Sequence, residues 1–547
     1  MTHRRNAAAR QQPNRRRFLG TGLCGGLVAA TLTERTQSSP AADHPFELSE
    51  LTIGDLQEGM RTGQYTSRSL AERYLARIEA IDRQGPSLRS VIEINPDALA
   101  VADALDKERR AKGARGPLHG IPILIKDNID TADRMSTTAG SLALVGARPP
   151  EDAFLIGQLS RAGALLLGKT NLSEWANIRC SYSTSGWSGR GGRTRNPYVL
   201  DRNPSGSSSG SGAAVAAALC AAAIGTETDG SIVSPSSVNG IVGIKPTVGL
   251  ISRTGVIPIS HTQDTAGPMA RTVRDAAILL GALAGVDAKD CATTSARAKA
   301  ALDYTKFLDR GGLRGARIGV ARNYFGFHDA VDAVLAEALA AMKSEGATLI
   351  DPADLPNMDK LNDPENLVLS YELKADLNAY LTRLGPQAPV RSLQDVIEYN
   401  KRNSTREMPY FGQDRFLKAE ARGPLTSKEY LEALEKCGRL ARAEGIDAVM
   451  DKHKLDALVA PSEGPAWLTD LVAGDRTLCN STTAAAVAGY PSITVPAGFV
   501  FGLPIGISWF GRAWTEPTLL KLAYAFEQAT KLRRPPRFLA TAELPRT

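Results

Sequence analysis

The stretch from Asn203 to Thr247 constrains the fold of this chain more than any other segment. It opens with the run Gly206-Ser-Ser-Ser-Gly-Ser211, continues through an Ala-rich segment, and reaches a second polar turn at Thr226-Glu-Thr-Asp-Gly-Ser231. Alanine side chains are too small to form the apolar stripe of an ordinary surface helix. We therefore predict that the Ala-rich segment is a helix packed tightly in a core, with a polar loop at each end.

A single lysine stands at the end of an apolar run upstream, in Gly120-Ile-Pro-Ile-Leu-Ile-Lys126-Asp-Asn128. We expect Lys126 to be buried, and burial favours the neutral amine, which can act as a base. A base and two serine-bearing loops are the parts of a Ser-Lys hydrolase. The alternative is a lysine at a strand end that forms an ion pair, here with Asp127.

These motifs resemble those of the amidase signature family, whose catalytic triad is two serines and a lysine. The likeness extends to Gly168-Lys-Thr-Asn-Leu-Ser-Glu-Trp175, Gln263-Asp-Thr-Ala-Gly-Pro-Met269 and Ala488-Gly-Tyr-Pro-Ser-Ile-Thr-Val-Pro-Ala-Gly498, and it covers roughly residues 46 to 537. The resemblance implies an amidase domain over residues 46–540. It also implies that the enzyme needs no metal or organic cofactor.

The resemblance also assigns roles within the site. It implies that Lys126 is the base, that Ser207 relays the proton, and that Ser231 is the nucleophile. The family places the oxyanion hole at the backbone N–H groups of Thr228, Asp229, Gly230 and Ser231. It further implies a cis peptide bond between Gly206 and Ser207.

The substrate class is suggested by similarity to one branch of the family. Trp175-Ala-Asn, Ser185-Gly-Trp187-Ser and Gly225-Thr-Glu-Thr-Asp-Gly-Ser231 are similar to bacterial peptide amidases, which remove the C-terminal amide from peptides. We predict hydrolysis of a small-molecule or short peptide amide with release of ammonia. The alternatives are other amides or esters, a transamidation subunit, or a noncatalytic binding protein on the same scaffold.

Two positions depart from the common family pattern. Many members carry Gly-Gly-Ser at the nucleophile and an Arg two residues later, whereas this chain has Asp229-Gly230-Ser231 and Val233. Asp229 either accepts a substrate N–H or fixes the loop, and the sequence leaves both interpretations open.

Two other patterns compete for the same residues. Gly163-Ala-Leu-Leu-Leu-Gly-Lys-Thr170 fits the P-loop spacing, but its variable positions are apolar and indicate a strand. Gly206-Ser-Ser-Ser-Gly210 fits the nucleophile elbow of an α/β-hydrolase, which also needs a downstream acid and histidine. His261, His328 and His453 follow, but none has a supporting context.

The amino terminus predicts an export signal over residues 1–42. Asn14-Arg-Arg-Arg-Phe-Leu-Gly20 resembles the twin-arginine motif, a short apolar segment follows from Phe18 to Leu32, and Ser39-Pro-Ala-Ala42 offers a cleavage site. The segment is too short to span a bilayer. We therefore expect a periplasmic or secreted protein without stable membrane insertion.

The net charge of +7 gives no reason to expect nucleic-acid binding. Residues 1–43 carry seven arginines against Glu34 and Asp43, so most of the excess positive charge belongs to the predicted signal. The six cysteines show no CxxC or metal-ligand spacing. The sequence does not determine the oligomeric state.

Apolar periodicity and short apolar runs indicate alternating helices and strands. We predict an α/β fold with one compact domain, in which a large mixed β-sheet is covered by helices on both faces. The charged region from about 285 to 450 is expected to supply helices that shape the substrate cleft. The predicted helices are 67–83 and 96–112, and the predicted strands are 121–125, 164–167, 316–320 and 454–460.

Overall fold

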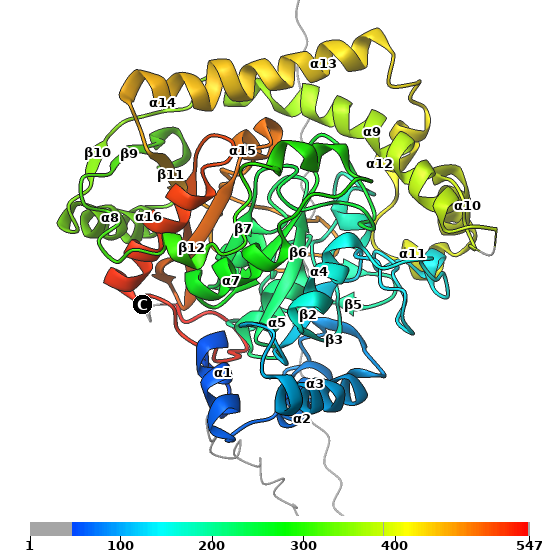
Figure 1. Ribbon diagram of the computed structural model, residues 1–547. Helices are drawn as coiled ribbons and strands as arrows, with labels where there is room; N and C mark the ends of the chain where they lie inside the picture. The colour runs from blue at the N-terminus through cyan, green and yellow to red at the C-terminus, as the bar shows by residue number, and fades with distance from the viewer. Residues whose placement is uncertain (1–45, 387, 545–547) are drawn as a thin grey trace, which may run out of the picture. The chain divides into compact units, whose positions relative to one another are not determined.

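One mixed sheet of eleven strands organises the protein, in the order β1-β3-β2-β6-β8-β7-β12-β13-β11-β9-β10 (Figure 1). The computed structural model describes residues 46–386 and 388–544. The described residues from Leu48 onward form one compact unit. The strands are β1 (Val91–Ile94), β2 (Pro122–Lys126), β3 (Leu165–Thr170), β6 (Ala222–Glu227), β7 (Val242–Lys245), β8 (Thr265–Ala270), β9 (Arg317–Val320), β10 (Thr348–Ile350), β11 (Ala457–Pro461), β12 (Ser492–Val500) and β13 (Leu503–Phe510), with β4 (Trp187–Ser188) and β5 (Gly192–Arg193) pairing separately.

The sheet mixes parallel and antiparallel pairs. Strand β2 is parallel to both β3 and β6, whereas β6 pairs antiparallel with β8. All residues of β2, β6, β8 and β13 are buried, so the side chains on both faces of these strands are covered. This confirms the predicted α/β class and its large mixed sheet.

The helices pack along the sheet and against one another. Helices α9, α12 and α13 pack together, in the yellow-green to gold part of Figure 1. The α-helices are α1 (Ile53–Thr62), α2 (Ser67–Arg77), α3 (Ala98–Lys112), α4 (Phe154–Ala162), α5 (Ser209–Ala216), α6 (Val233–Val238), α7 (Val273–Leu283), α8 (Asp329–Ser344), α9 (Asn362–Arg383), α10 (Leu393–Arg402), α11 (Ser404–Glu407), α12 (Asp414–Glu420), α13 (Lys428–Gly438), α14 (Asp447–His453), α15 (Thr483–Ala488) and α16 (Glu516–Thr530).

The prediction for the Ala-rich segment was half right. Helix α5 ends at Ala216, and the chain then turns and enters strand β6 at Ala222. Hydrogen bonding to β2 and β8 on either side outweighs the helix propensity of alanine, because propensity is a weak preference that tertiary pairing overrides. Both parts are buried, as a segment of such small side chains requires.

Other boundaries moved by a few residues. Helix α2 continues as a π-helix over Ile78–Gln84, which matches the predicted helix 67–83. Helix α3 begins at Ala98 instead of residue 96, because the Asn95 side chain accepts the Asp97 N–H in a turn before it. The strand predicted from residue 454 begins at Ala457, since Lys454 adopts a left-handed conformation that ends α14.

The P-loop interpretation is wrong. Its Gly-Lys-Thr residues belong to strand β3, and Lys169 is fully buried. The Lys169 Nζ donates to the Ile129 carbonyl and to Thr137 Oγ1, both at 2.7 Å. A lysine held in this way inside a strand cannot reach a phosphate.

The predicted signal, residues 1–42, lies outside the described residues. Within the described part, no helix is both long and apolar enough to cross a membrane.

Candidate active site

Lys126 is the last residue of strand β2, and its side chain is fully buried. Its Nζ lies 2.8 Å from Ser207 Oγ, 2.9 Å from Thr226 Oγ1 and 3.1 Å from the Thr226 carbonyl oxygen. Thr226 belongs to β6, the strand next to β2, so the parallel pairing of the two strands places it beside the lysine.

These contacts suit a neutral amine. A neutral lysine has two N–H donors and one lone pair. Its two N–H groups can donate to the carbonyl and hydroxyl oxygens of Thr226, which leaves the lone pair for the hydroxyl proton of Ser207. The Asn128 Nδ2 also donates to Thr226 Oγ1, at 3.0 Å, and so helps to fix that hydroxyl.

Burial lowers the pKa of Lys126 to about 7, although the negative charges of Glu227 and Asp264 oppose the shift. The desolvation cost of the ammonium form is the dominant cause. An amine with this pKa is neutral in about half of the molecules near pH 7 and in more of them at higher pH, so it can accept a proton.

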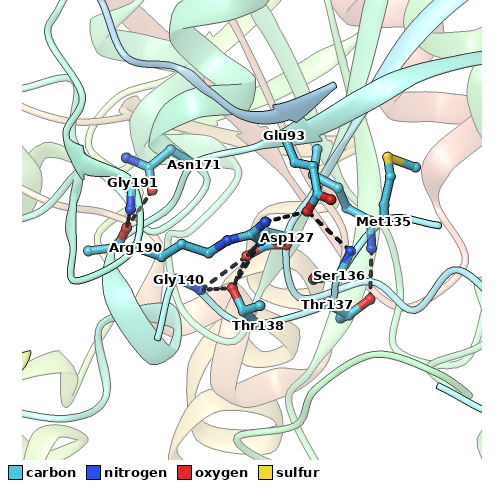
Figure 2. Close-up of polar contacts among 12 residues, drawn as sticks. Glu93, Asp127, Met135, Ser136, Thr137, Thr138, Gly140, Asn171, Arg190 and Gly191 are labelled. Atoms are coloured by element: carbon cyan, nitrogen blue, oxygen red, sulfur yellow. Dashed lines mark hydrogen bonds and ion pairs between the residues drawn. The ribbon is translucent and has the colours of Figure 1, made fainter. Parts of the chain in front are cut away.

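Asp127 does not pair with Lys126. Its carboxylate faces the other way, where Arg190 Nη1 lies 3.3 Å from Oδ1 and the Gly140 N–H donates to Oδ2 at 3.2 Å (Figure 2). The Thr138 hydroxyl also donates to it, and Arg190 contacts Glu93 as well. The ion-pair alternative for Lys126 is therefore wrong, and Asp127 belongs to a separate polar network beneath the site.

Ser207 lies in a tight loop before helix α5. The Gly206–Ser207 peptide bond is cis, which confirms that expectation. A Cβ at position 206 would lie 2.2 Å from Ser173 Oγ, so only glycine fits there. The next residue ties the two serine loops together, because the Ser208 N–H donates to the Ser231 carbonyl at 3.1 Å.

Ser231 sits in the turn between β6 and α6. The backbone N–H groups of Thr228, Asp229, Gly230 and Ser231 make no hydrogen bond to any other described residue. Consecutive free N–H groups in a turn can bind an anion. This turn therefore has the donors that an oxyanion hole requires.

Two further contacts shape the turn around Ser231. Gly230 has a φ of +77°, which favours glycine, and a Cβ there would lie 2.9 Å from Thr482 Oγ1. The Glu227 carboxylate accepts the N–H groups of Ile232 and Val233 at 2.7 and 3.0 Å. The N–H groups that follow the serine are thus satisfied, whereas those at and before it stay free.

Asp229 fixes the turn to helix α15. Its Oδ1 accepts the Thr482 hydroxyl at 2.5 Å, and its Oδ2 accepts the Thr483 hydroxyl at 2.7 Å. Burial raises the pKa of Asp229, while these two hydrogen bonds lower it. The loop-fixing interpretation therefore has direct structural support, and each carboxylate oxygen keeps a further lone pair for another donor.

A cavity of about 300 Å³ opens beside these loops. Ser207 and Ser231 both line it, together with Thr228, Asp229 and Gly230, but Lys126 does not. Ser207 thus hydrogen bonds to the buried lysine on one side and faces the cavity on the other. This placement is what a relay between a hidden base and a reactive group requires.

Ionisable side chains from distant parts of the chain also line the cavity. Burial raises the pKa values of both Glu365 and Glu463 to about 8. The Glu463 Oε1 is buried without a hydrogen-bond partner among the described residues. Asp475 and Arg415 also line the cavity.

Comparison with known proteins identifies the family. A family model described as Amidase matches residues 69–520. The chain belongs to the amidase signature family. It is 44% identical to a probable amidase of Arabidopsis thaliana over 504 residues, which covers 90% of this chain and 93% of that protein.

The crystal structure of native peptide amidase from Stenotrophomonas maltophilia is also similar, with 51% identity and a TM-score of 0.86 over 90% of this chain and 100% of that one. A structure of the peptide amidase PAM in complex with the competitive inhibitor chymostatin matches with 51% identity and a TM-score of 0.87, over 90% of this chain and 99% of that one. As an amidase, the protein is a hydrolase of carbon–nitrogen bonds in amides.

In this amidase signature enzyme, the residues predicted for the site come together. Ser207, Thr228, Asp229, Gly230 and Ser231 line one cavity, and Lys126 lies directly behind it. His261, His328 and His453 are absent from its lining, so the α/β-hydrolase interpretation has no structural support.

Sequence reasoning missed part of the site. Thr226 opens the motif Thr226-Glu-Thr-Asp-Gly-Ser231, so its place in the same motif as Ser231 could have marked it as a residue of the site. No sequence motif marks the other residues of the cavity lining, namely Glu365, Arg415 and Glu463. They reach the cavity only through tertiary packing.

Proposed function

We propose that this enzyme hydrolyses the C-terminal carboxamide of peptides and releases ammonia, with Lys126, Ser207 and Ser231 as its catalytic residues. The observation that carries the assignment of residues is the position of Ser207, which hydrogen bonds to the buried Lys126 and also faces the cavity that holds Ser231. The similarity to peptide amidases supports the substrate class.

The first half of the reaction forms an acyl-enzyme. Neutral Lys126 takes the hydroxyl proton of Ser207, which in turn takes the proton of Ser231 as Ser231 Oγ attacks the amide carbonyl carbon. The resulting oxyanion accepts hydrogen bonds from the free N–H groups of residues 228–231, each worth about 3–4 kcal/mol in comparable sites. The proton returns through Ser207 to the amide nitrogen, and ammonia leaves.

The second half regenerates the enzyme. Water loses a proton to the same Ser207–Lys126 relay and attacks the ester carbonyl of acyl-Ser231. Collapse of the second tetrahedral intermediate returns the proton to Ser231 Oγ and releases the peptide acid. The sum is one amide and one water converted to one acid and one ammonia.

Ammonia release over a panel of substrates tests the substrate class. The panel consists of amino-acid amides, peptide amides and fatty amides of matched solubility. We expect kcat/KM to be greatest for peptide amides. A strong preference for long-chain fatty amides, with no ammonia from peptide amides, would contradict the proposal and favour the alternative of another amide substrate.

Inhibition provides a second test of the same site. Because chymostatin is a competitive inhibitor of the similar peptide amidase PAM, we expect it to compete with a peptide amide here. Inhibition that is noncompetitive, or absent at saturating chymostatin, would place the peptide-binding site elsewhere.

We also propose that the enzyme is exported by the twin-arginine route. The sequence Asn14-Arg-Arg-Arg-Phe-Leu-Gly20 supports this, and arginine and lysine are not interchangeable in a motif read by a receptor. Cell fractionation of the full chain tests it. Replacing Arg15 and Arg16 by lysine should retain the enzyme in the cytoplasm, and unchanged export of this variant would exclude the route.

A further inference from the structure

A second cavity of about 440 Å³ adjoins the catalytic cavity. The two cavities share part of their walls, namely Ile178, Asn366, Leu369 and Arg415. The shared residues place the two cavities side by side. The second cavity is therefore positioned to receive a part of the substrate that extends beyond the catalytic cavity.

The second cavity lies between helices α9 and α12, which pack against each other (Figure 1). Its apolar lining includes Leu367, Leu369 and Leu373 of α9. Three basic residues, Arg415, Lys418 and Arg422, also line it, against a single acidic one, Asp363. The cavity thus combines an apolar wall with an excess of positive charge.

Two of these cations are only partly engaged. Lys418 Nζ lies 3.3 Å from Asp414, and the lysine side chain is 67% exposed, so this is a weak surface pair. The Arg422 Nε donates to Ser370 Oγ at 2.9 Å, and its Nη1 lies 3.6 Å from Glu429. Both side chains keep unused N–H donors.

Arg415 is the most informative of the three. It lies at the junction, because it lines both cavities, and it is half-buried. Among the described residues, its N–H groups make no hydrogen bond or close ion pair, although its positive charge acts on the Glu365 carboxyl of the catalytic cavity and opposes the rise of that group's pKa. A guanidinium carries five N–H donors in a planar fork that suits carbonyl and carboxylate oxygens. A partly desolvated guanidinium whose N–H groups make no hydrogen bond is therefore available for a ligand that carries such oxygens.

The catalytic cavity has the opposite character. Apart from Arg415, its ionisable lining residues are the carboxyl groups of Asp229, Glu365, Glu463 and Asp475. Burial raises the pKa of each of these four carboxyl groups, so the catalytic cavity offers buried acids and, apart from Arg415, no cation that could pair with an anionic side chain. The cations that could pair with one line the second cavity, and Arg415 lies where the two linings meet.

We propose that the second cavity binds the part of a peptide amide that precedes its terminal residue, and that Arg415, Lys418 and Arg422 select an acidic side chain there. This inference rests on the proposed peptide amidase activity. The apolar wall would contact the aliphatic stem of a glutamate, while the cations contact its carboxylate.

Three matched substrates test the proposal. Acetylated tripeptide amides that differ only by Glu, Gln or Lys are compared, with the variable residue placed in turn one and two positions before the terminal leucine amide. At low salt, we expect the Glu peptide at one of these positions to have a kcat/KM about fivefold above the Gln peptide and more above the Lys peptide. The preference should shrink in 0.5 M NaCl, because salt screens partly exposed charges.

Variants locate the effect. Lys418 lines the second cavity but not the catalytic one, so Lys418→Glu should reduce or reverse the ratio of Glu to Lys peptides. Lys428→Glu is the matched control, because Lys428 is an exposed lysine on neighbouring α13 that lines neither cavity, and the ratio should stay at its wild-type value.

The outcomes separate this inference from the proposed function. Equal kcat/KM for Glu, Gln and Lys peptides at both positions, or an unchanged ratio in Lys418→Glu, would overturn the acidic subsite while the peptide amidase activity stands. Absence of ammonia from every peptide amide, with turnover of other amides, would instead overturn the proposed function.

Discussion

The Lys126 Nζ lies 2.8 Å from Ser207 Oγ, although 81 positions separate the two residues in the chain. Strand β2 delivers the lysine, and the loop before α5 delivers the serine. Because Lys126 is fully buried and does not reach the cavity, any proton it exchanges with a substrate must pass through Ser207.

Ser231→Ala should abolish acylation and leave the fold intact. The variant removes one small hydroxyl from a turn whose backbone contacts do not involve that oxygen. A serine-directed phosphonate should label the wild-type enzyme stoichiometrically and fail to label the variant, as measured by intact-protein mass spectrometry. Ser404→Ala, an exposed serine on α11, is the control and should be labelled like the wild type. Stoichiometric labelling of Ser231→Ala within the cavity would refute the assignment.

Lys126→Met should lower kcat/KM by more than roughly a thousandfold, because loss of one member disables a cooperative relay. Methionine preserves most of the side-chain volume, which limits the cavity that Lys126→Ala would leave. Lys169→Met is the matched control, since Lys169 is equally buried on neighbouring β3 but hydrogen bonds only outside the site. If both variants lose activity to the same extent per folded molecule, the effect is structural and the base is another group.

Activity should rise with pH through about 7. Burial lowers the pKa of Lys126 to about 7, and the amine must be neutral to accept a proton, so protonation below this pH removes the base. The profile of kcat/KM, which reports the free enzyme, should therefore fall on the acid side with a limiting slope of one. A flat profile from acid to mildly alkaline pH, with chemistry shown to be rate-limiting, would argue against a lysine base.

The proposed catalytic residues could be predicted from the sequence because they lie in contiguous motifs. Ser207 and Ser231 each occur in a turn whose small and polar residues leave few alternative conformations, and Lys126 ends an apolar strand. All three come together as expected. The strand β6 was missed because alanine alone favours a helix, and only pairing with β2 and β8 makes it a strand.

The residues that shape the cavity could not be predicted. Glu365 comes from α9, Arg415 from α12, and Glu463 from the loop after β11. The charged region from about 285 to 450 does supply helices to the cavity, as expected, but within it the simplest interpretation of any single charged residue is a solvated surface. Their approach to Ser231 depends on how the helices pack, and local sequence does not encode that arrangement.

Thr226 should prove to be a positioning residue for Lys126. Thr226→Val removes the hydroxyl that accepts from Lys126 Nζ at 2.9 Å and from Asn128 Nδ2 at 3.0 Å, with little change in shape. We expect kcat to fall about tenfold, in line with the loss of one buried hydrogen bond of about 1.5 kcal/mol. Since an acceptor stabilises the ammonium more than the amine, its loss should also move the acid limb of the pH profile to lower pH.

Thr226→Ser is the matched control for this residue, because it restores the hydroxyl and should restore both kcat and the acid limb. A Thr226→Val enzyme with reduced kcat but an unmoved acid limb would show that the threonine acts on the fold and not on the lysine.

Asp229→Asn should weaken both stability and catalysis. The carboxylate accepts one hydroxyl on each oxygen, from Thr482 and Thr483, whereas an amide keeps only one accepting oxygen. The loss of one charge-assisted hydrogen bond should lower the free energy of unfolding by about 1–3 kcal/mol, measured by denaturant titration. Because the same residue supplies one of the free N–H groups beside Ser231, a loosened turn should also lower kcat.

The paired threonine variants decide between the two roles of Asp229. If the carboxylate acts by fixing the turn, Thr482→Val with Thr483→Val should reproduce the loss of kcat, and adding Asp229→Asn should cost little more, because the three residues form one network. If Asp229 instead accepts a substrate N–H, the threonine variants should retain activity. In that case Asp229→Asn should lower kcat/KM for a peptide amide. It should not lower kcat/KM for an analogue in which an ester oxygen replaces the preceding peptide N–H, because that analogue has no N–H that the wild-type carboxylate could accept. We expect the first outcome, since both carboxylate oxygens are already engaged by the threonine hydroxyls.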